Sequence, residues 1–244
     1  MFASRRIAAN IMNQRLPLIN IAIDGPAGAG KSTVARMVAR DLHYIYVDTG
    51  AMYRAVALKA MEAGLPADDA EGVTDLSRRL DIRLVPEPDG QRVLADGEDV
   101  SRQIRSLEVN RQVSRYAVIA GVRGRMAELQ RRMAGAKGVV MDGRDIGTQV
   151  LPDAELKVFL TASPRERALR RFKELGDSPG ITLEQLEADI AQRDRDDEQR
   201  AISPLVQAKD ARRIDSTGRS AEEVAREIAE WGFAIARTIL AEEK

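Results

Sequence analysis

The sequence predicts an α/β fold built on a parallel five-stranded sheet flanked by helices, and three observations lead to it. Short runs rich in β-branched residues alternate with helical patterns, which is typical of a parallel sheet covered on both faces. Between the first run and the first helical pattern lies GPAGAGKS, a glycine-rich segment with the spacing of a phosphate-binding loop. One later segment alternates apolar and polar residues, which predicts a small inserted β hairpin.

Five short apolar runs account for the predicted sheet. They cover residues 19–23, 44–47, 138–141, 156–160 and 213–215. Helical patterns lie between most of these strands, and they include residues 31–42, 51–63 and 221–241. Gly64 follows the second of these helices, where a glycine commonly ends a helix. Because the glycine-rich segment has a strand before it and a helix after it, the predicted sheet is of the P-loop NTPase type.

An insert interrupts the alternation of strands and helices. Ile82, Leu84 and Val93 alternate with polar residues, and the segment PEPDG between them has the composition of a turn. We therefore predict an antiparallel hairpin in a small subdomain at residues 64–108. The core then consists of residues 18–63 and 109–244.

Composition argues against several classes of protein. The 244 residues carry 38 Lys and Arg against 38 Asp and Glu, and nucleic-acid-binding proteins usually show a basic surplus instead. There is no cysteine, so disulfides and zinc–thiolate sites are excluded. No apolar run approaches the roughly 18 residues that a membrane span needs. We expect a cytoplasmic monomer with no nucleic-acid or membrane partner.

The first 17 residues differ in composition from the rest of the chain. MFASRRIAANIMNQRLP contains arginines but no acidic residue. We expect a disordered extension, or a chain whose true start is Met12. The alternative is an organellar targeting peptide, since such peptides are rich in arginine and poor in acids.

The glycine-rich segment carries the first functional prediction. Its glycines let the backbone fold tightly, so that N–H groups and the N-terminus of the next helix form an anion site. Lys31 would reach the β- and γ-phosphates of a nucleoside triphosphate, and the Ser32 hydroxyl would bind Mg²⁺. This motif alone does not separate a kinase from an ATPase, a GTPase or a regulatory switch.

A carboxylate at the end of a predicted buried strand marks a second candidate site. In VVMDGRDIGT, Asp142 has the position of a Walker-B-type aspartate that holds the metal or its waters. Arg144 suits a phosphate clamp, because a guanidinium binds two oxygens at once. The alternative is a polar turn in which Asp142 caps a helix. Beside a P-loop, the functional interpretation is favoured.

Two later segments are dense in arginine. Arg167 and Arg171, in PRERALRRF, lie four residues apart and hence on one helix face. Arg193, Asp197 and Arg200, in QRDRDDEQR, recur at three- and four-residue steps. Mixed charges of this kind usually form a solvated helix face. In a phosphate-transfer enzyme, however, positive groups that close over the transferred phosphoryl group are expected.

The segment VDTGAMYRA leaves the second predicted strand and enters a helix. Ligands of doubly wound sheets gather at the carboxyl ends of strands, so a second substrate could meet Thr49, Tyr53 and Arg54 there. Thr49 could also cap the helix, and Tyr53 could instead pack in the core.

Several segments together resemble the bacterial-type cytidylate kinase family. They are IDGPAGAGKST, DTGAMYRA, LADGEDVS, DGRDIGT, RDRDDEQR followed by AISPL, and IDST, in order over about residues 19–240. The resemblance implies a nucleoside-monophosphate kinase fold with an enlarged monophosphate-binding insert and a short lid near residues 164–200. It also implies Mg²⁺-assisted transfer of the γ-phosphoryl group from ATP to CMP or dCMP, a step of pyrimidine nucleotide metabolism.

The resemblance further implies roles for individual residues. The ATP-binding residues are Gly25, Pro26, Ala27, Gly28, Ala29, Gly30, Lys31, Ser32 and Thr33, and the metal-binding residues are Ser32 and Asp142. The acceptor phosphate is held at Thr49, Arg54 and Arg144, with Tyr53 beside them, and cytosine is read at Ser114, Arg123 and Asp145. Arg193 and Asp197 fall on the ribose side with Arg200 close by, and Arg167 and Arg171 resemble lid arginines. The expected catalytic residues are Lys31, Arg144, Arg193, Arg167 and Arg171.

Two alternatives remain. One is a P-loop kinase for UMP or another small acceptor, which a panel of acceptors would distinguish. The other is a GTP-binding switch. Such proteins read guanine with an N-K-x-D segment, and this chain has none.

Overall fold

The computed structural model describes residues 16–87, 90–175 and 182–242, and these residues form two compact units. Unit 1 holds the described residues up to Ile45 and from Lys137 onward, and unit 2 spans Tyr46–Ala136. Unit 2 contains the predicted insert and extends beyond it on both sides, so the limits 64 and 108 stay a prediction. The turn PEPDG, the extension and the predicted lid fall partly outside the described residues.

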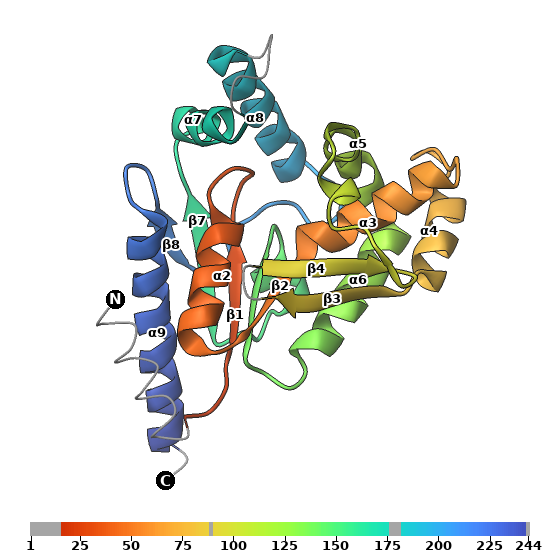
Figure 1. The fold of residues 1–244 in the computed structure, drawn as a ribbon. Helices are drawn as coiled ribbons and strands as arrows, with labels where there is room; N and C mark the ends of the chain where they lie inside the picture. Colours follow the sequence, from red (N-terminus) through yellow and green to blue (C-terminus); the bar gives the residue numbers. More distant parts are fainter. Residues whose placement is uncertain (1–15, 88–89, 176–181, 243–244) are drawn as a thin grey trace. The chain divides into compact units, whose positions relative to one another are not determined.

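The main sheet has five strands in the order β2-β6-β1-β7-β8 (Figure 1). Its strands are β1 (Asn20–Asp24), β2 (Ile45–Asp48), β6 (Val139–Gly143), β7 (Leu156–Thr161) and β8 (Arg212–Asp215). β1 pairs in parallel with β6 and β7, and β7 with β8. All five residues of β1 are buried, as expected for the central strand of a covered parallel sheet. The predicted fold class is confirmed.

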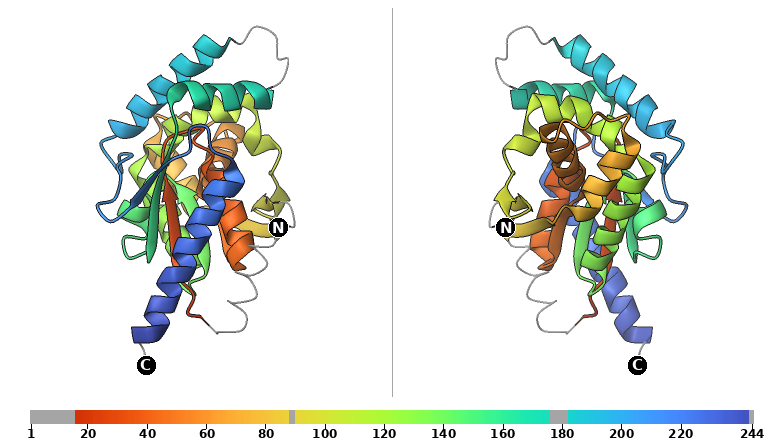
Figure 2. Two further views of the ribbon diagram at one scale, coloured as in Figure 1. Left: turned by 90° about the vertical axis from the view of Figure 1, so that its left-hand side faces the viewer. Right: turned by 90° about the vertical axis from the view of Figure 1, so that its right-hand side faces the viewer.

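Helices α2 (Lys31–Leu42) and α9 (Ala221–Glu242) pack against each other in unit 1 (Figure 1). Gly232 of α9 makes close packing possible, since an added Cβ would lie 3.2 Å from the Cδ1 atom of Ile21 and 3.3 Å from that of Leu42. Helices α7 (Pro164–Leu175) and α8 (Leu183–Glu198) form a second pair, and both views of Figure 2 show it beyond the carboxyl end of β7. No helix in the described ranges is long and apolar enough to cross a membrane.

Unit 2 combines helices with a second sheet. The helices are α3 (Thr49–Glu62), α4 (Ala70–Arg79), α5 (Leu107–Ala117) and α6 (Ala120–Ala134), with a 3₁₀ turn η1 (Gln103–Arg105). Strands β3 (Ile82–Glu87) and β4 (Gly90–Ala95) form the predicted antiparallel hairpin, and the register pairs Leu84 with Val93. A short third strand, β5 (Glu98–Asp99), pairs with β4 and was not predicted.

The start of α3 differs from the prediction. The helix begins at Thr49, two residues before the predicted start, and its N-cap is Asp48. The Asp48 carboxylate accepts a hydrogen bond from the backbone N–H of Ala51 at 2.8 Å. The prediction that Thr49 caps this helix is therefore wrong, because the carboxylate one residue earlier takes that place.

Candidate nucleotide-binding and phosphoryl-transfer site

Glycines shape the loop between β1 and α2. Gly28 and Gly30 have φ angles of +76° and +86°, in the left-handed region that residues with a side chain rarely adopt. At Gly25, an added Cβ would lie 1.9 Å from the carbonyl oxygen of Leu160, so a larger residue would displace the backbone. As the N-cap of α2, Gly30 places no side chain over the first N–H groups of the helix. This geometry suits an anion at the N-terminus of α2.

Lys31, the first residue of α2, is a buried cation beside this loop. Its side chain donates a hydrogen bond from Nζ to the carbonyl oxygen of Pro26 at 2.7 Å, and the residue is 5% exposed. Burial lowers the pKa of Lys31 well below its usual value, and repulsion from Arg144 adds to the effect, while three nearby carboxylates oppose it. A bound phosphate would stabilise the charged form of this ammonium group.

The two residues predicted to hold a metal contact each other. The Ser32 hydroxyl donates a hydrogen bond to Oδ2 of Asp142 at 2.8 Å. Asp142 lies within β6 near its carboxyl end and is buried, so the structure does not favour its alternative interpretation as a helix cap. Mg²⁺ prefers oxygen ligands and commonly binds one or two protein groups together with substrate phosphates. A hydroxyl and a carboxylate at the P-loop therefore fit Mg²⁺.

Asp24, the last residue of β1, is a buried carboxylate that the motifs did not single out. It accepts hydrogen bonds from the backbone N–H groups of Ile146 at 2.9 Å and Gly147 at 2.7 Å. Burial raises the pKa of Asp24 to about 6, and repulsion from Asp145 adds to this, although the two hydrogen bonds and Lys31 lower it. The signal that could have found it is an acid between a buried strand and the P-loop.

Arg144 meets Asp197 and Arg200 in unit 1, although it lies 53 residues before Asp197 in the chain. Nε of Arg144 donates to Oδ2 of Asp197 at 2.8 Å, and Nη1 of Arg200 lies 3.7 Å from Oδ1. Burial raises the pKa of Asp197, but attraction and a hydrogen bond from Arg144, with Arg200 and Arg193 nearby, outweigh it and hold the pKa below its usual value. The structure thus joins residues predicted for the acceptor phosphate and the ribose.

Arg167, which was predicted as a lid arginine, binds protein atoms in unit 1, and its lid role stays a prediction. Its Nε donates to the carbonyl oxygen of Ala162 at 2.9 Å, and its Nη1 donates to that of Ala27 at 3.0 Å. Both terminal nitrogens also bind the Asp194 carboxylate, at 3.0 and 2.6 Å. The side chain is 4% exposed. Its donors therefore hold protein atoms, and the residue ties α7 and α8 to the P-loop.

Arg170, which the motifs did not select, contacts the P-loop from the same helix. Its Nη1 donates to the carbonyl oxygen of Ala29 at 3.3 Å, and its Nη2 donates to that of Ser216 at 2.8 Å. In a trans peptide, the carbonyl and the following N–H point in opposite directions. Because the carbonyls of Ala27 and Ala29 bond to arginines of α7, the N–H groups of the two following glycines point away from those arginines.

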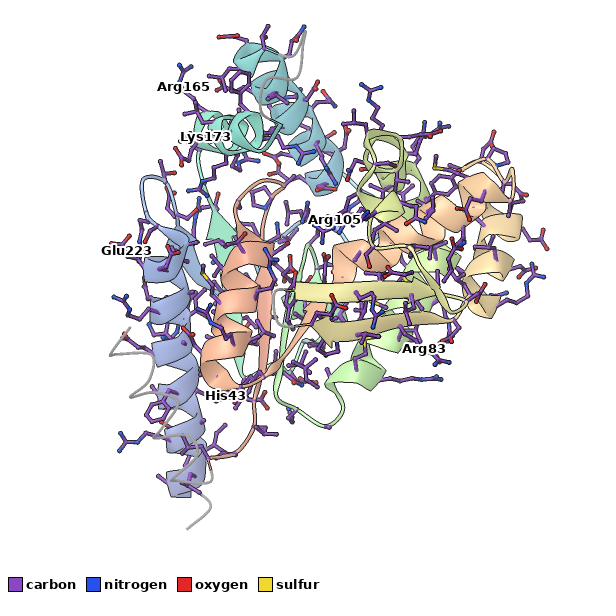
Figure 3. The ribbon with its side chains drawn as sticks, viewed as in Figure 1. His43, Arg83, Arg105, Arg165, Lys173 and Glu223 are labelled. Atoms are coloured by element: carbon purple, nitrogen blue, oxygen red, sulfur yellow. The ribbon has the colours of Figure 1, made fainter. Side chains whose placement is uncertain are left out.

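Three further polar or charged residues of unit 1 differ in how exposed they are. Arg165 is 68% exposed and extends outward from α7 (Figure 3), as the solvated-face interpretation predicts for this helix. Arg171 is half-buried on α7, and its lid role stays a prediction. His43 is exposed at the C-terminal end of α2, the end opposite the P-loop (Figure 3).

In unit 2, Asp48 organises residues predicted to meet the acceptor phosphate. Nη2 of Arg54 lies 3.2 Å from Oδ2 of Asp48, and Nη2 of Arg105 lies 3.9 Å from the same oxygen. The buried Nε of Arg54 has no hydrogen-bond partner in residues 16–87, 90–175 and 182–242, and a phosphate oxygen would supply one. Thr49 is buried next to Asp48. Asp48 and Arg105 were not predicted; the signal for Asp48 is again an acid at a strand end.

Unit 2 also holds two of the three residues predicted to read cytosine. Arg123 is 6% exposed, donates from Nη1 to the carbonyl oxygen of Ala117 at 3.1 Å, and stacks over the ring of Tyr53 at 5.5 Å. Tyr53 also packs against the core of this unit, in line with its alternative interpretation. Ser114 lies half-buried on α5. The third, Asp145, belongs to unit 1.

Comparison with known proteins agrees with the motifs. A family model described as cytidylate kinase matches residues 21–232. The chain belongs to the cytidylate kinase family. The relative from Pelotomaculum thermopropionicum is 53% identical and covers 86% of this chain and 93% of its own, and that from Desulfitobacterium hafniense is 52% identical and covers 84% and 89%. The family resemblance predicted from the motifs is confirmed.

Two further matches complete the comparison. The cytidylate kinase of Bacillus velezensis is 50% identical and covers 87% of this chain and 95% of its own length. A solved structure of an uncharacterised protein from Eubacterium ventriosum covers 89% of this chain and 99% of its own at 11% identity, with a TM-score of 0.50. This last match is a likeness of fold alone.

Proposed function

We propose that the protein transfers the γ-phosphoryl group of ATP to CMP or dCMP, giving ADP with CDP or dCDP. The observation that carries the proposal is the P-loop geometry of unit 1, in a chain that belongs to the cytidylate kinase family: the Ser32 hydroxyl bonds to Asp142 at 2.8 Å, and the buried ammonium group of Lys31 lies beside the loop. Arg144, the predicted ligand of the acceptor phosphate, adds repulsion that lowers the pKa of Lys31. Bound anions would relieve this repulsion, and the phosphates of donor and acceptor are such anions.

On the donor side, ATP would bind with its phosphates in the loop from Gly25 to Gly30. Backbone N–H groups and the N-terminus of α2 would hold the phosphate oxygens, and Lys31 would contact the β- and γ-phosphates. Ser32 and Asp142 would hold Mg²⁺, which when bound neutralises charge on these phosphates.

The transfer forms one bond and breaks one. An oxygen of the acceptor phosphate forms a bond to the γ-phosphorus, the bond from that phosphorus to the bridging oxygen breaks, and ADP leaves. Lys31 would stabilise the charge that develops on the transferred group, and Arg144 would orient the acceptor phosphate. Arg193, on α8, is the third cation that we assign to this site.

Base choice follows from hydrogen-bond chemistry. Cytosine has a donor at N4 and an acceptor at N3, whereas uracil has an acceptor at O4 and a donor at N3. We assign N4 to Asp145, which only accepts when ionised, and N3 to Arg123, which only donates. Facing uracil, each pair would leave buried groups unmatched at about 1–3 kcal/mol, or roughly 10- to 100-fold per contact. Ser114 would position the base without choosing strongly, because a hydroxyl both donates and accepts.

A panel of acceptors tests the proposal. ADP release would be measured with ATP and each of CMP, dCMP, UMP, AMP and shikimate as the acceptor. We expect turnover with CMP and dCMP at a kcat/KM at least about 10-fold above that of UMP, and none with shikimate. Turnover that favours UMP or a non-nucleotide would contradict the proposal and support the alternative of another small acceptor.

The proposal includes a cytoplasmic monomer that acts on small nucleotides without a nucleic-acid or membrane partner. The zero net charge and the lack of cysteine support it. Light scattering of the purified protein would confirm the monomer at 26.9 kDa, and a multiple of this mass would contradict it.

A further inference from the structure

One buried carboxylate has no place in the proposed reaction, although it lies between the residues that carry it. Asp24 immediately precedes the P-loop, and the N–H groups that it binds immediately follow Asp145. The proposed function needs the backbone around Arg144 and Asp145 to be held still, because both side chains would contact the acceptor. A residue that holds this backbone in place would therefore affect how the acceptor binds.

The turn after Asp145 is capped from a different strand. Residues Ile146–Val150 form a single π-helical turn, η2, and the first N–H groups of a helical turn lack a partner within the turn. Asp145 is the N-cap residue, but its side chain makes no capping hydrogen bond. Asp24 supplies both acceptors instead, from a position 122 residues before Ile146. The direction of the Asp145 side chain is thus set by a backbone that Asp24 holds.

Asp24 is itself held rigidly enough to act as an anchor. It is the last residue of the central strand, and its register partners are Gly143 on β6 and Phe159 on β7. It is 5% exposed. Because this backbone is paired on both sides and the residue is buried, the base of the anchor is fixed together with the start of the P-loop.

The approach between Asp24 and the turn is close. An added Cβ at Gly147 would lie 3.4 Å from Oδ2 of Asp24 and 3.2 Å from Cδ of Lys157. The φ angle of Gly147 is not in the left-handed region, so alanine there is limited by space rather than by backbone strain. The Gly147→Ala variant therefore crowds the turn against Lys157 and Asp24 while the carboxylate stays chemically unchanged.

We propose that Asp24 is a positioning residue that fixes residues 144–147 against the P-loop, so that Arg144 and Asp145 meet the acceptor in one geometry. The inference rests on the proposed function for the identity of the acceptor. It predicts that loss of one carboxylate oxygen disturbs acceptor binding and base choice more than ATP binding.

The test compares three variants after circular dichroism has shown that each is folded. Asp24→Asn keeps the shape but replaces one acceptor by a donor, which faces a backbone N–H. Gly147→Ala adds a methyl group that contacts the side chains of both Lys157 and Asp24. Lys157→Met is the matched control: Lys157 is buried and also lies against Gly147, but its ammonium binds Asp210 and the carbonyl oxygen of Pro152. KM and kcat would be measured for ATP, CMP and UMP.

With Asp24→Asn we expect the CMP-to-UMP ratio of kcat/KM to fall at least 10-fold, and KM for the acceptor to rise more than KM for ATP. Gly147→Ala should give a smaller fall in this ratio and a smaller rise in KM for the acceptor. Lys157→Met should keep the ratio within twofold while lowering Tm. An unchanged ratio and equal KM changes with Asp24→Asn would overturn the inference. If Asp24→Asn does not fold, the inference is overturned when Gly147→Ala shows an unchanged CMP-to-UMP ratio and equal changes in KM for acceptor and ATP.

The inference and the proposed function can fail separately. If the wild-type protein does not prefer CMP, the proposed function fails. The KM comparison is then made with whichever monophosphate the wild type accepts, and an equal change in KM for acceptor and ATP overturns the inference. Suppose instead that the wild type prefers CMP, and that Asp24→Asn retains this preference and changes KM for acceptor and ATP equally. Then only the inference fails.

Discussion

Two aspartates at strand ends organise the two units in different ways. Asp24 in unit 1 and Asp48 in unit 2 each end a strand of the main sheet and are buried. Asp24 accepts from two backbone N–H groups of a distant turn. Asp48 accepts from one backbone N–H group of its own helix and also from the guanidinium of Arg54.

The difference between these partners has a consequence for ligand binding. A backbone N–H cannot turn away without moving the chain, so the Asp24 contacts hold a fixed geometry. An arginine side chain can rotate, so Arg54 and Arg105 can exchange part of their contact with Asp48 for a phosphate. We infer that unit 1 is prearranged around the phosphates of ATP, whereas in unit 2 the acceptor phosphate competes with a carboxylate for its arginines.

Removal of the ammonium group of Lys31 should give the largest effect. Because this cation acts mainly on charge that develops in transfer, Lys31→Ala should lower kcat by about 10²-fold or more and leave the fold intact. Steady-state kinetics and circular dichroism would check this. A folded variant with unchanged kcat would remove the P-loop lysine from the mechanism.

The exchange inferred for unit 2 can be tested at its arginines. Arg54→Ala should raise KM for CMP by roughly 10- to 100-fold, because a charge-assisted hydrogen bond to the phosphate is lost. Arg105→Ala should have a smaller effect, since Arg105 lies 3.9 Å from Asp48 and is 64% exposed. Arg83→Ala is the control, because Arg83 is 69% exposed on β3, where it pairs with Asp81 (Figure 3). Equal KM values for Arg54→Ala and Arg83→Ala would contradict the exchange.

The fixed geometry inferred for unit 1 can be tested at Arg167. Lysine keeps the charge but cannot bind Asp194 with two nitrogens and the Ala27 carbonyl at once. Arg167→Lys should therefore raise KM for ATP about 10-fold and change KM for CMP less than twofold. Arg165→Lys, on the exposed face of the same helix, is the matched control and should change neither value. An unaltered KM for ATP in Arg167→Lys would show that the P-loop does not depend on this contact.

The pH dependence of stability gives the smallest effect. The pKa of Asp24 is raised from 3.8 to about 6 in the folded protein, so folding favours its protonated form. Its charged form therefore destabilises the folded state above pH 6, and this cost is relieved as pH falls toward 4. Between pH 7 and pH 5 the free energy of unfolding of the wild type should rise by about 1 kcal/mol relative to Asp24→Asn. Urea unfolding at both pH values would measure this difference, and a constant difference would contradict it.

Local patterns predicted the parts of the molecule that local chemistry determines. The strand before the P-loop, the loop itself and α2 were predicted with the right boundaries within one residue, because β-branched runs, glycines and helical spacing act over a few residues. The hairpin of β3 and β4 was predicted for the same reason. The helix start at Thr49 was misplaced, since two adjacent residues, Asp48 and Thr49, are both good N-caps and only the structure shows which one bonds to Ala51.

Long-range partners account for what the sequence did not predict. Asp24 binds residues 122 and 123 positions away, and Arg170 binds Ala29 across 141 positions. The arginines of α7 follow one another closely in sequence, so spacing alone does not tell which of them face the P-loop. For Arg167, selected as a lid residue, the sequence did not predict that its guanidinium binds the Ala27 carbonyl and Asp194, and its lid role stays a prediction.

The most direct test of the account is a competition between CMP and UMP. Both acceptors at equal concentration would be incubated with ATP and the wild-type protein, or with Asp145→Ala or Arg123→Ala, and CDP and UDP would be quantified by chromatography. For the wild type we predict CDP in at least about 10-fold excess over UDP at early times, and a clearly smaller excess for each variant. A wild-type excess that both variants retain in full would contradict the assignment of cytosine reading to Asp145 and Arg123. Equal amounts of CDP and UDP from the wild type would contradict the proposed function itself.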